Sequence, residues 1–260
     1  MNALLSASNL SRRFGGLRAV DEFNFSVGDG EILGLIGPNG AGKTTVVNLV
    51  SGVIAPTSGR VTFAGEDVTA MPSHELARRG LVRTFQSTAV YANRTVRENA
   101  IRGAFLRRYP GLLSAFFGTR RARALQQQTA DEADKLLAWL GLDHVADAPA
   151  DALPYGYQKT LGIVIALAAE PRLIMLDEPV AGLSAEEADH VRDTIKRVQQ
   201  RGITVVVIDH NMRFISGLCD RVVVCRQGQN LAEGTPREVL ADPRVIEAYL
   251  GKAYAAAKNN

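Results

Sequence analysis

The sequence predicts an α/β fold built on a parallel sheet that is covered on both faces. Two apolar runs, "RLIMLDEP" at 172–179 and "ITVVVIDH" at 203–210, are nearly continuous, which is typical of strands buried on both faces. The segment 184–202 between them begins with a serine, places acids early and basic residues late, and ends on a glycine, as helices do. The order strand, helix, strand favours a parallel sheet.

The bulk properties of the chain fit one large domain or a core with a lobe. It has 260 residues, of which 46% are hydrophobic and 22% charged, and a formal net charge of +3. This mild positive charge permits an anionic ligand or an anionic membrane surface, but it does not indicate a nucleic-acid binder. The start of the chain lacks the pattern of a secretory signal. The longest apolar block, 163–169, is too short to span a bilayer, which takes about 20 residues.

The first third of the chain reads as strands around one helix. "EILGLIG" at 31–37 is a buried strand that runs into a glycine-rich loop, and a helical pattern follows from Lys43. "AVDEFNFSV" at 19–27 alternates like a half-buried strand, and "GRVTFAG" at 59–65 is a short strand between glycines. We expect these two strands to form a small antiparallel layer around the glycine-loop strand.

The remainder of the chain is helical in its first part. The residue pattern from 88 to 165 is typical of helices, and "TADEADKLLAWLGL" at 129–142 has apolar residues at helical spacing. "VVVCRQG" at 222–228 is expected to add a further strand, and the tail 253–260 is expected to fray.

The stretch "GPNGAGKTT" at 37–45 fits the spacing of a phosphate-binding loop between a strand and a helix. Glycines let the backbone wrap tightly, so that several N–H groups point at the phosphates, and the start of the helix adds positive potential. Lys43 supplies a full charge, Thr44 can ligate Mg²⁺, and Thr45 reaches the inner phosphate. The residues expected to bind ATP here are Gly37, Pro38, Asn39, Gly40, Ala41, Gly42, Lys43, Thr44 and Thr45.

Polar side chains at the ends of the later strands are candidates for hydrolysis. Asp177 ends a buried strand, where it can hold Mg²⁺, and Glu178 follows, where it can orient a water for attack on the terminal phosphate. His210 ends the next strand and points toward the same edge, and the amide of Gln86 could touch both Mg²⁺ and the attacking water. Without the phosphate loop, the two acids could merely cap a turn and the histidine could be structural.

These motifs in this order resemble the nucleotide-binding subunit of ABC transporters. They are "GPNGAGKTT", Gln86, "LPYGYQ", "LIMLDEP", "AGLS" and His210, and the resemblance covers nearly the whole chain. It implies a single ABC ATPase domain: a P-loop core with an antiparallel β layer, a helical subdomain, and ATP and Mg²⁺ as cofactors. The implied parts are the core with its β layer at 1–87 and 166–235, the helical subdomain at 88–165 and a C-terminal tail at 236–260.

The resemblance also implies how such a chain works. Two subunits would sandwich each ATP between the phosphate loop of one and the signature segment of the other, with Phe14 stacked on the adenine. The signature of this chain departs from Leu-Ser-Gly-Gly-Gln, since it reads Leu153, Pro154, Tyr155, Gly156 and Tyr157.

The altered signature predicts weaker sandwiching of ATP rather than none. Pro154 removes both a hydroxyl and an N–H, but the N–H groups of Gly156 and Tyr157 still open a helix that can bind an anion. Ser184 stands where many relatives hold aspartate, which puts communication between the two ATP sites in question. A nucleotide-binding regulator with little turnover remains an alternative.

A nearer resemblance is to the ATPase subunits of branched-chain amino acid importers. It rests on "RRFGGLRAVDEFNFSV" at 12–27, the long insert after 95–100 and the ending 231–251. It implies permease subunits in the membrane, a second ABC ATPase subunit that is a copy or a different chain, and, indirectly, a periplasmic solute-binding protein. It places the chain on the cytoplasmic face of the inner membrane, as a peripheral protein. The implied cargo is a hydrophobic amino acid or a related small solute such as an amide.

Other functions stay open beside this one. The lipopolysaccharide-export ATPase is similar in its core. A soluble ABC ATPase acting on nucleic acid is a further alternative, although such proteins join two cassettes or insert a coiled coil, and this chain has one phosphate loop and no sustained heptads. The insert 104–125 mixes apolar pairs with arginines. It predicts either a docking surface for a membrane subunit near anionic lipid or an apolar face packed on its own lobe.

Overall fold

The two apolar runs that predict a parallel sheet are adjacent strands in the structure. In the computed structural model, which describes residues 3–84, 90–106 and 119–250, β7 (Leu173–Asp177) pairs in parallel with β8 (Thr204–Ile208). Strand β3 (Ile32–Ile36), which leads into the glycine-rich loop, lies on the other side of β8. The predicted α/β fold with a parallel sheet is confirmed.

This sheet has six strands in the spatial order β10-β9-β3-β8-β7-β6. The three not yet bounded are β6 (Leu81–Thr84), β9 (Arg221–Arg226) and β10 (Gln229–Gly234). Strand β9 is the one expected at 222–228, and it runs parallel to β3. Strand β10 is antiparallel to β9 and closes one side of the sheet.

A second sheet forms the predicted antiparallel layer. Its strands, in the order β2-β1-β4-β5, are β1 (Ala3–Phe14), β2 (Leu17–Gly28), β4 (Ser58–Phe63) and β5 (Glu66–Asp67). Strands β2 and β4 are those expected at 19–27 and 59–65. They pair with β1 and not with each other, and β1 was not predicted. The glycine-loop strand belongs to the parallel sheet, against which this layer packs.

The described helices are α1 (Lys43–Val50), α2 (Ser73–Arg79), α3 (Val96–Gly103), α5 (Arg120–Leu140), α6 (Tyr155–Ala168), α7 (Ala185–Gln200), α8 (Met212–Leu218), α9 (Pro236–Ala241) and α10 (Pro243–Leu250). Three short 3₁₀ turns are η1 (Ala104–Leu106), η2 (Asp143–Val145) and η3 (Ala150–Ala152). The predicted helix at 184–202 is α7, whose Ser184 caps the backbone N–H of Glu187. The run at 129–142 is the second half of the longer helix α5. None of the helices within the described residues is long and apolar enough to cross a bilayer.

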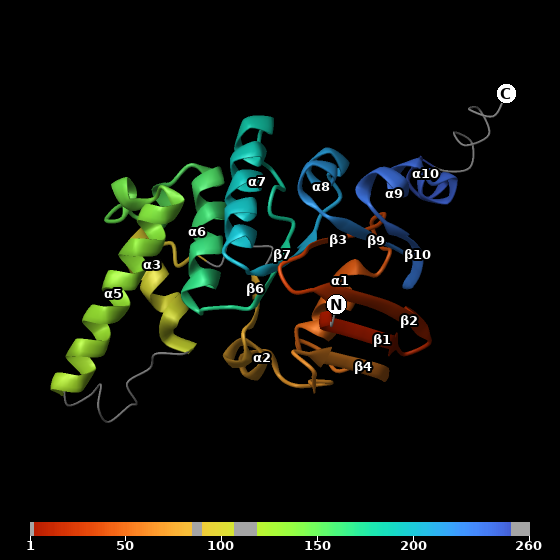
Figure 1. The fold of residues 1–260 in the computed structure, drawn as a ribbon, viewed down its shortest axis with the longest axis horizontal. Helices are drawn as coiled ribbons and strands as arrows, with labels where there is room; N and C mark the ends of the chain where they lie inside the picture. The colour runs from red at the N-terminus through yellow and green to blue at the C-terminus, as the bar shows by residue number, and fades with distance from the viewer. Residues whose placement is uncertain (1–2, 85–89, 107–118, 251–260) are drawn as a thin grey trace.

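Alternate residues of the parallel strands build two separate cores. Leu33 and Leu35 of β3 pack with α1 and the antiparallel sheet, whereas Ile32 and Ile36 pack with helices α3 and α5 to α8. The parallel sheet therefore lies between the antiparallel layer with α1 and a layer of helices (Figure 1). Helices α3, α5 and α6 extend beyond the sheet as a lobe. The division into segments 1–87, 88–165, 166–235 and 236–260 stays a prediction.

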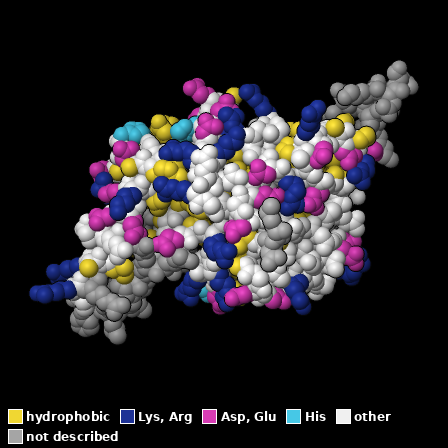
Figure 2. Space-filling model, in the orientation of Figure 1, with side chains coloured by type: hydrophobic (Ala, Val, Ile, Leu, Met, Phe, Trp, Pro, Cys, Tyr) yellow, Lys and Arg dark blue, Asp and Glu magenta, His cyan; other side chains and the backbone are white. Residues whose placement is uncertain are grey.

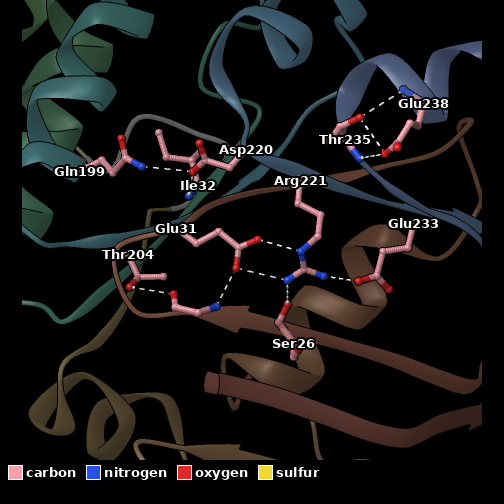
Figure 3. Close-up of polar contacts among 11 residues, drawn as sticks. Ser26, Glu31, Ile32, Gln199, Thr204, Asp220, Arg221, Glu233, Thr235 and Glu238 are labelled. Carbon is pink, nitrogen blue, oxygen red and sulfur yellow. Dashed lines mark hydrogen bonds and ion pairs between the residues drawn. The ribbon is translucent and has the colours of Figure 1, made fainter. Parts of the chain in front are cut away.

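The edge where the parallel strands begin, which we call the amino edge, is held by an ion-pair cluster (Figure 3). The Arg221 guanidinium donates from Nε to Glu31 Oε1 at 2.8 Å, from Nη2 to the Ser26 carbonyl at 2.6 Å, and from Nη1 to Glu233. Nearby, Asp220 Oδ2 accepts the Ile32 N–H at 2.8 Å. These contacts tie β2, β3, β9 and β10 together on the side opposite the glycine-rich loop.

Candidate functional site

The glycine-rich loop occupies the opposite edge of the sheet, which we call the carboxyl edge, between β3 and α1. A Cβ at position 37 would lie 2.1 Å from the Cys225 carbonyl oxygen, and one at position 42 would lie 2.6 Å from the Ala19 carbonyl oxygen. The backbone at Gly42 is also left-handed, with φ of 103°. Only glycine fits these two positions, and the loop therefore closes tightly enough to turn N–H groups toward phosphate.

The Lys43 ammonium lies inside this loop. It donates to the carbonyl oxygens of Gly37 at 2.7 Å and Pro38 at 3.0 Å. Burial lowers the pKa of Lys43, and the opposing charges of nearby acids, Glu178 and Asp177 among them, partly offset that shift. A positive charge is thus held where a phosphate would approach the loop.

Most of the predicted phosphate and hydrolysis residues line one cavity of about 430 Å³, a size that suits a small-molecule ligand. Gly37, Pro38 and His210 are not among its lining residues. From the predicted set the cavity brings together Asn39, Gly40, Ala41, Gly42, Lys43, Thr44, Thr45, Asp177 and Glu178. Sequence reasoning missed five further lining residues, namely Leu17, Arg18, Ala19, Ile208 and Gln227. Leu17 is largely exposed at the end of the β1–β2 hairpin, and an exposed leucine carries no recognisable signal in a sequence.

Asp177 and Thr44 supply the oxygen ligands that Mg²⁺ prefers. A carboxylate and a hydroxyl that line the same cavity as the phosphate loop form a hard-oxygen donor set, so the residues present fit a Mg²⁺-nucleotide. Asp177 Oδ2 also accepts from Arg83 Nη2 at 2.7 Å. The predicted third metal-site residue, Gln86, lies outside the described residues.

The Glu178 backbone is left-handed, with φ of 48°, which is uncommon for a residue other than glycine. Its N–H donates to the Ile208 carbonyl at 2.7 Å, and its own carbonyl accepts from the buried Lys159 ammonium at 3.3 Å. Its Oε1 lies 3.7 Å from His210 Nδ1. The structure thus brings together the acid and the histidine that the sequence proposes for hydrolysis.

Asp209 precedes His210 and is buried beside it. Its Oδ1 accepts the backbone N–H of His210 at 2.8 Å and that of Asn211 at 2.9 Å. Burial raises the pKa of Asp209 above its usual range, and these hydrogen bonds act against the shift. Asp209 thereby shapes the turn that presents His210 at the carboxyl edge.

The signature segment opens helix α6, and none of its residues is among those that line the phosphate cavity. Leu153 is buried, whereas Tyr155 is 42% exposed and its ring centroid lies 5.2 Å from the Lys159 ammonium. The ring of Tyr157 lies between two histidines, with centroids 5.9 Å from His144 and 6.3 Å from His190. The packing of Tyr157 against α7 and η2 is a structural use of this unusual residue.

An acid of the chain already lies at the start of α6. Hydrogen bonds from Ser184, and then from the backbone of Gly156, hold the pKa of Glu187 below its usual range. A Cβ at position 156 would also lie 3.3 Å from Glu187 Oε1. The sequence predicts that a nucleotide approaches the backbone of Gly156 closely. In this structure the Glu187 carboxylate occupies that position.

The Phe14 ring is 46% exposed, under the Arg12 guanidinium at 4.9 Å. Phe14 pairs with Leu17 at the end of the β1–β2 hairpin, and it is Leu17 that lines the cavity. The proposed adenine contact of Phe14 remains a prediction, with Leu17 as an additional apolar side chain on the same hairpin.

Comparison with known proteins places the chain in a family. The "ABC transporter" family matches residues 20–181, and the family "Branched-chain amino acid ATP-binding cassette transporter" matches residues 229–255. The chain is 38% identical to the high-affinity branched-chain amino acid transport ATP-binding protein BraF of Pseudomonas aeruginosa, over 96% of the chain and 98% of BraF. It is 39% identical, with the same coverage, to LivG of Escherichia coli K12, which carries the same description.

Solved structures agree with these matches. A nucleotide-free ATP-binding cassette of an ABC transporter superposes with a TM-score of 0.86 and 32% identity, covering 96% of this chain and all of the other. The ADP conformation of such a cassette superposes equally well, at 32% identity over 97% of this chain. The lipopolysaccharide export ATP-binding protein LptB of Haemophilus influenzae is 32% identical over 97% of the chain and 99% of LptB. This chain therefore belongs to the ATP-binding subunits of ABC transporters and is an ATPase of that family.

Proposed function

We propose that the chain hydrolyses ATP to power import of branched-chain or other hydrophobic amino acids, or a related small solute, through separate permease subunits. The carrying observation is the match to BraF and LivG along 96% of the chain, joined by the branched-chain transporter match at 229–255. Identity to LptB is lower, at 32%, so export of lipopolysaccharide is the weaker candidate.

The cavity residues divide the chemistry among them. Lys43 and the loop N–H groups bind the phosphates, and Thr44 and Asp177 would hold Mg²⁺, which neutralises phosphate charge when it is bound. Glu178 orients the attacking water and accepts its proton, and His210, 3.7 Å away, supports that carboxylate at the terminal phosphate. The strained Glu178 backbone is the local feature that favours a catalytic role for this acid.

The proposed working form is a dimer with a second ABC ATPase subunit, either a copy or a different chain. Because the signature segment does not line the phosphate cavity of its own chain, it is available to the nucleotide of the partner. Glu187 would have to yield its place at Gly156 when that nucleotide docks, and Pro154 removes one donor. We expect weak sandwiching at this half-site.

The proposed location is the cytoplasmic face of the inner membrane, bound to permease subunits, with a periplasmic solute-binding protein as an indirect partner and no nucleic acid. Figure 2 shows acidic and basic side chains interspersed on the displayed face, with hydrophobic side chains gathered over the α6 region. The mixed charge on this face does not resemble the basic stripe of a nucleic-acid binder. The central part of the predicted insert, 107–118, lies outside the described residues, and its role as a docking surface stays a prediction.

Purification of the tagged chain from membranes of its host tests this function. We expect integral membrane subunits and a second ABC ATPase to come with it, and reconstituted vesicles with the cognate binding protein to take up leucine, isoleucine or valine when ATP is inside. The matched control carries Lys43→Ala, which should assemble but not transport. Absence of membrane subunits, or uptake that ignores ATP, would refute the proposal.

A further inference from the structure

Arg83, which no motif in the sequence singles out, is a buried cation next to the proposed metal-binding carboxylate. Its side chain is 8% exposed, and that of Asp177 is 5% exposed. Its guanidinium donates from Nη2 to Asp177 Oδ2 at 2.7 Å and from Nη1 to Asn48 Oδ1 of α1 at 2.6 Å. Nη1 also donates to Oγ of Ser51, the residue that caps α1, at 3.1 Å. One planar group therefore connects β7 to the helix that follows the phosphate loop.

Arg83 contacts Asp177 from a different side than a bound phosphate would. Asp177 lines both the phosphate cavity and a neighbouring cavity of about 340 Å³ between β6, α3 and α6. Arg83 lines the neighbouring cavity and is not among the residues that line the phosphate cavity. The arginine thus holds the carboxylate from behind and leaves the phosphate side of Asp177 to a ligand.

The α1 contacts of Arg83 matter because of where they fall on that helix. Asn48 is four residues after Thr44, and residues four apart lie on the same face of a helix. Thr44 and Asp177 are the two described side chains expected to hold Mg²⁺. A guanidinium bonded to both Asp177 and Asn48 therefore constrains the separation between the two ligands.

We propose that Arg83 is a positioning residue that fixes Asp177 relative to Thr44 and so sets the affinity of the site for Mg²⁺-nucleotide over free nucleotide. The inference rests on the proposed function, since it requires Mg²⁺ at this site. A lysine keeps the charge but has one compact ammonium, which cannot span acceptors on two elements as the planar fork of arginine does.

The experiment measures binding of a fluorescent ATP analogue with excess Mg²⁺ and with EDTA, for the wild type and Arg83→Lys. The ratio of the two affinities reports how strongly Mg²⁺ is coupled to nucleotide. We expect Arg83→Lys to lower this ratio about tenfold, the usual effect of removing a group that orients a metal ligand, while affinity in EDTA stays within about twofold. In an Asp177→Asn background, Arg83→Lys should change the ratio no further.

Arg221→Lys is the matched control, because Arg221 also pairs with carboxylates and backbone, but at the amino edge. It should lower the melting temperature and leave the ratio unchanged. If Arg83→Lys does the same, Arg83 is only structural and the inference fails. If Arg83→Lys raises the ratio, the arginine competes with Mg²⁺ and the inference also fails.

Asn48→Ala keeps the test decisive should Arg83→Lys not fold. It removes one anchor of Arg83 and preserves its pair with Asp177, so we expect the ratio to fall about threefold, as for one lost hydrogen bond. An unchanged ratio would overturn the inference. If the wild type binds nucleotide with the same affinity in Mg²⁺ and in EDTA, the proposed function fails, and the inference fails with it.

Discussion

The two edges of the parallel sheet carry similar charged side chains but engage them differently. At the amino edge, the Glu31 carboxylate accepts a hydrogen bond from the Arg221 guanidinium, and Asp220 accepts a backbone N–H of β3. At the carboxyl edge, Lys43, Asp177 and Glu178 line a cavity. Protein groups contact these side chains without closing the cavity that they line. Acids closed off by protein partners stabilise the fold, whereas acids anchored with one side open to a cavity can serve a ligand.

The largest effect that this comparison predicts is on turnover at the carboxyl edge. Glu178→Gln keeps the shape of the side chain but removes the base, so ATP turnover should fall about 10²-fold or more. Nucleotide affinity and melting temperature should stay near those of the wild type. Steady-state phosphate release and a binding titration measure this, and a variant as active as the wild type would remove Glu178 from the mechanism.

Gly37→Ala should act next most strongly. Its Cβ would lie 2.1 Å from a backbone carbonyl oxygen, so the loop must shift, at a cost of about 1–3 kcal/mol and at least tenfold in nucleotide affinity. Gly162→Ala in α6 is the control, because a Cβ there meets nothing within 4 Å. Equal nucleotide affinities of the two variants would show that the loop does not need this close approach.

Glu31→Ala tests the other edge. Loss of the two hydrogen bonds from Arg221 should lower the free energy of unfolding by about 1–3 kcal/mol, or a few degrees in melting temperature. Nucleotide affinity should not change, because the amino edge lies away from the cavity. Chemical denaturation and a binding titration would decide, and a loss of affinity without loss of stability would reverse the assignment of the two edges.

The smallest predicted effect concerns Asp209 and pH. Because burial raises its pKa in the folded chain, the folded state holds this proton to higher pH than the unfolded state does. Stability from this group is present below the usual pKa of aspartate and is lost as pH rises through the folded value. Asp209→Asn should therefore raise the melting temperature by about 1–3 °C at neutral pH and by less toward pH 4. A lower melting temperature at neutral pH would contradict this.

Local patterns were enough to predict part of the molecule. The phosphate loop, the strand ending at Asp177 and the capped start of α7 each depend on neighbours within a few residues, and the structure has them as predicted. Strand β6 was missed because it is four residues long and pairs with β7, which is distant in the chain. Strands β1 and β10 were also missed, although they form hairpins with β2 and β9, because their sequences are rich in polar residues and do not alternate regularly.

The same limit explains why Arg83 was not predicted. Its partners Asn48, Ser51 and Asp177 are 35, 32 and 94 residues away in the chain, so no window of sequence contains the contact. The role of Glu187 at Gly156 was hidden for the same reason, because α6 and α7 meet only in the fold. Residues that bind a ligand lie in motifs, whereas residues that position them depend on the tertiary structure.

The nucleotide site at the carboxyl edge is tested most directly by measuring nucleotide affinity and melting temperature together for Lys43→Ala and Arg221→Lys. We expect the two variants to lose different properties. Lys43→Ala should weaken ATP binding about 10²-fold with little change in melting temperature, because it removes a charge held inside the phosphate loop. Arg221→Lys should melt several degrees lower and bind ATP normally. Unchanged ATP affinity in Lys43→Ala would contradict the nucleotide site at the carboxyl edge.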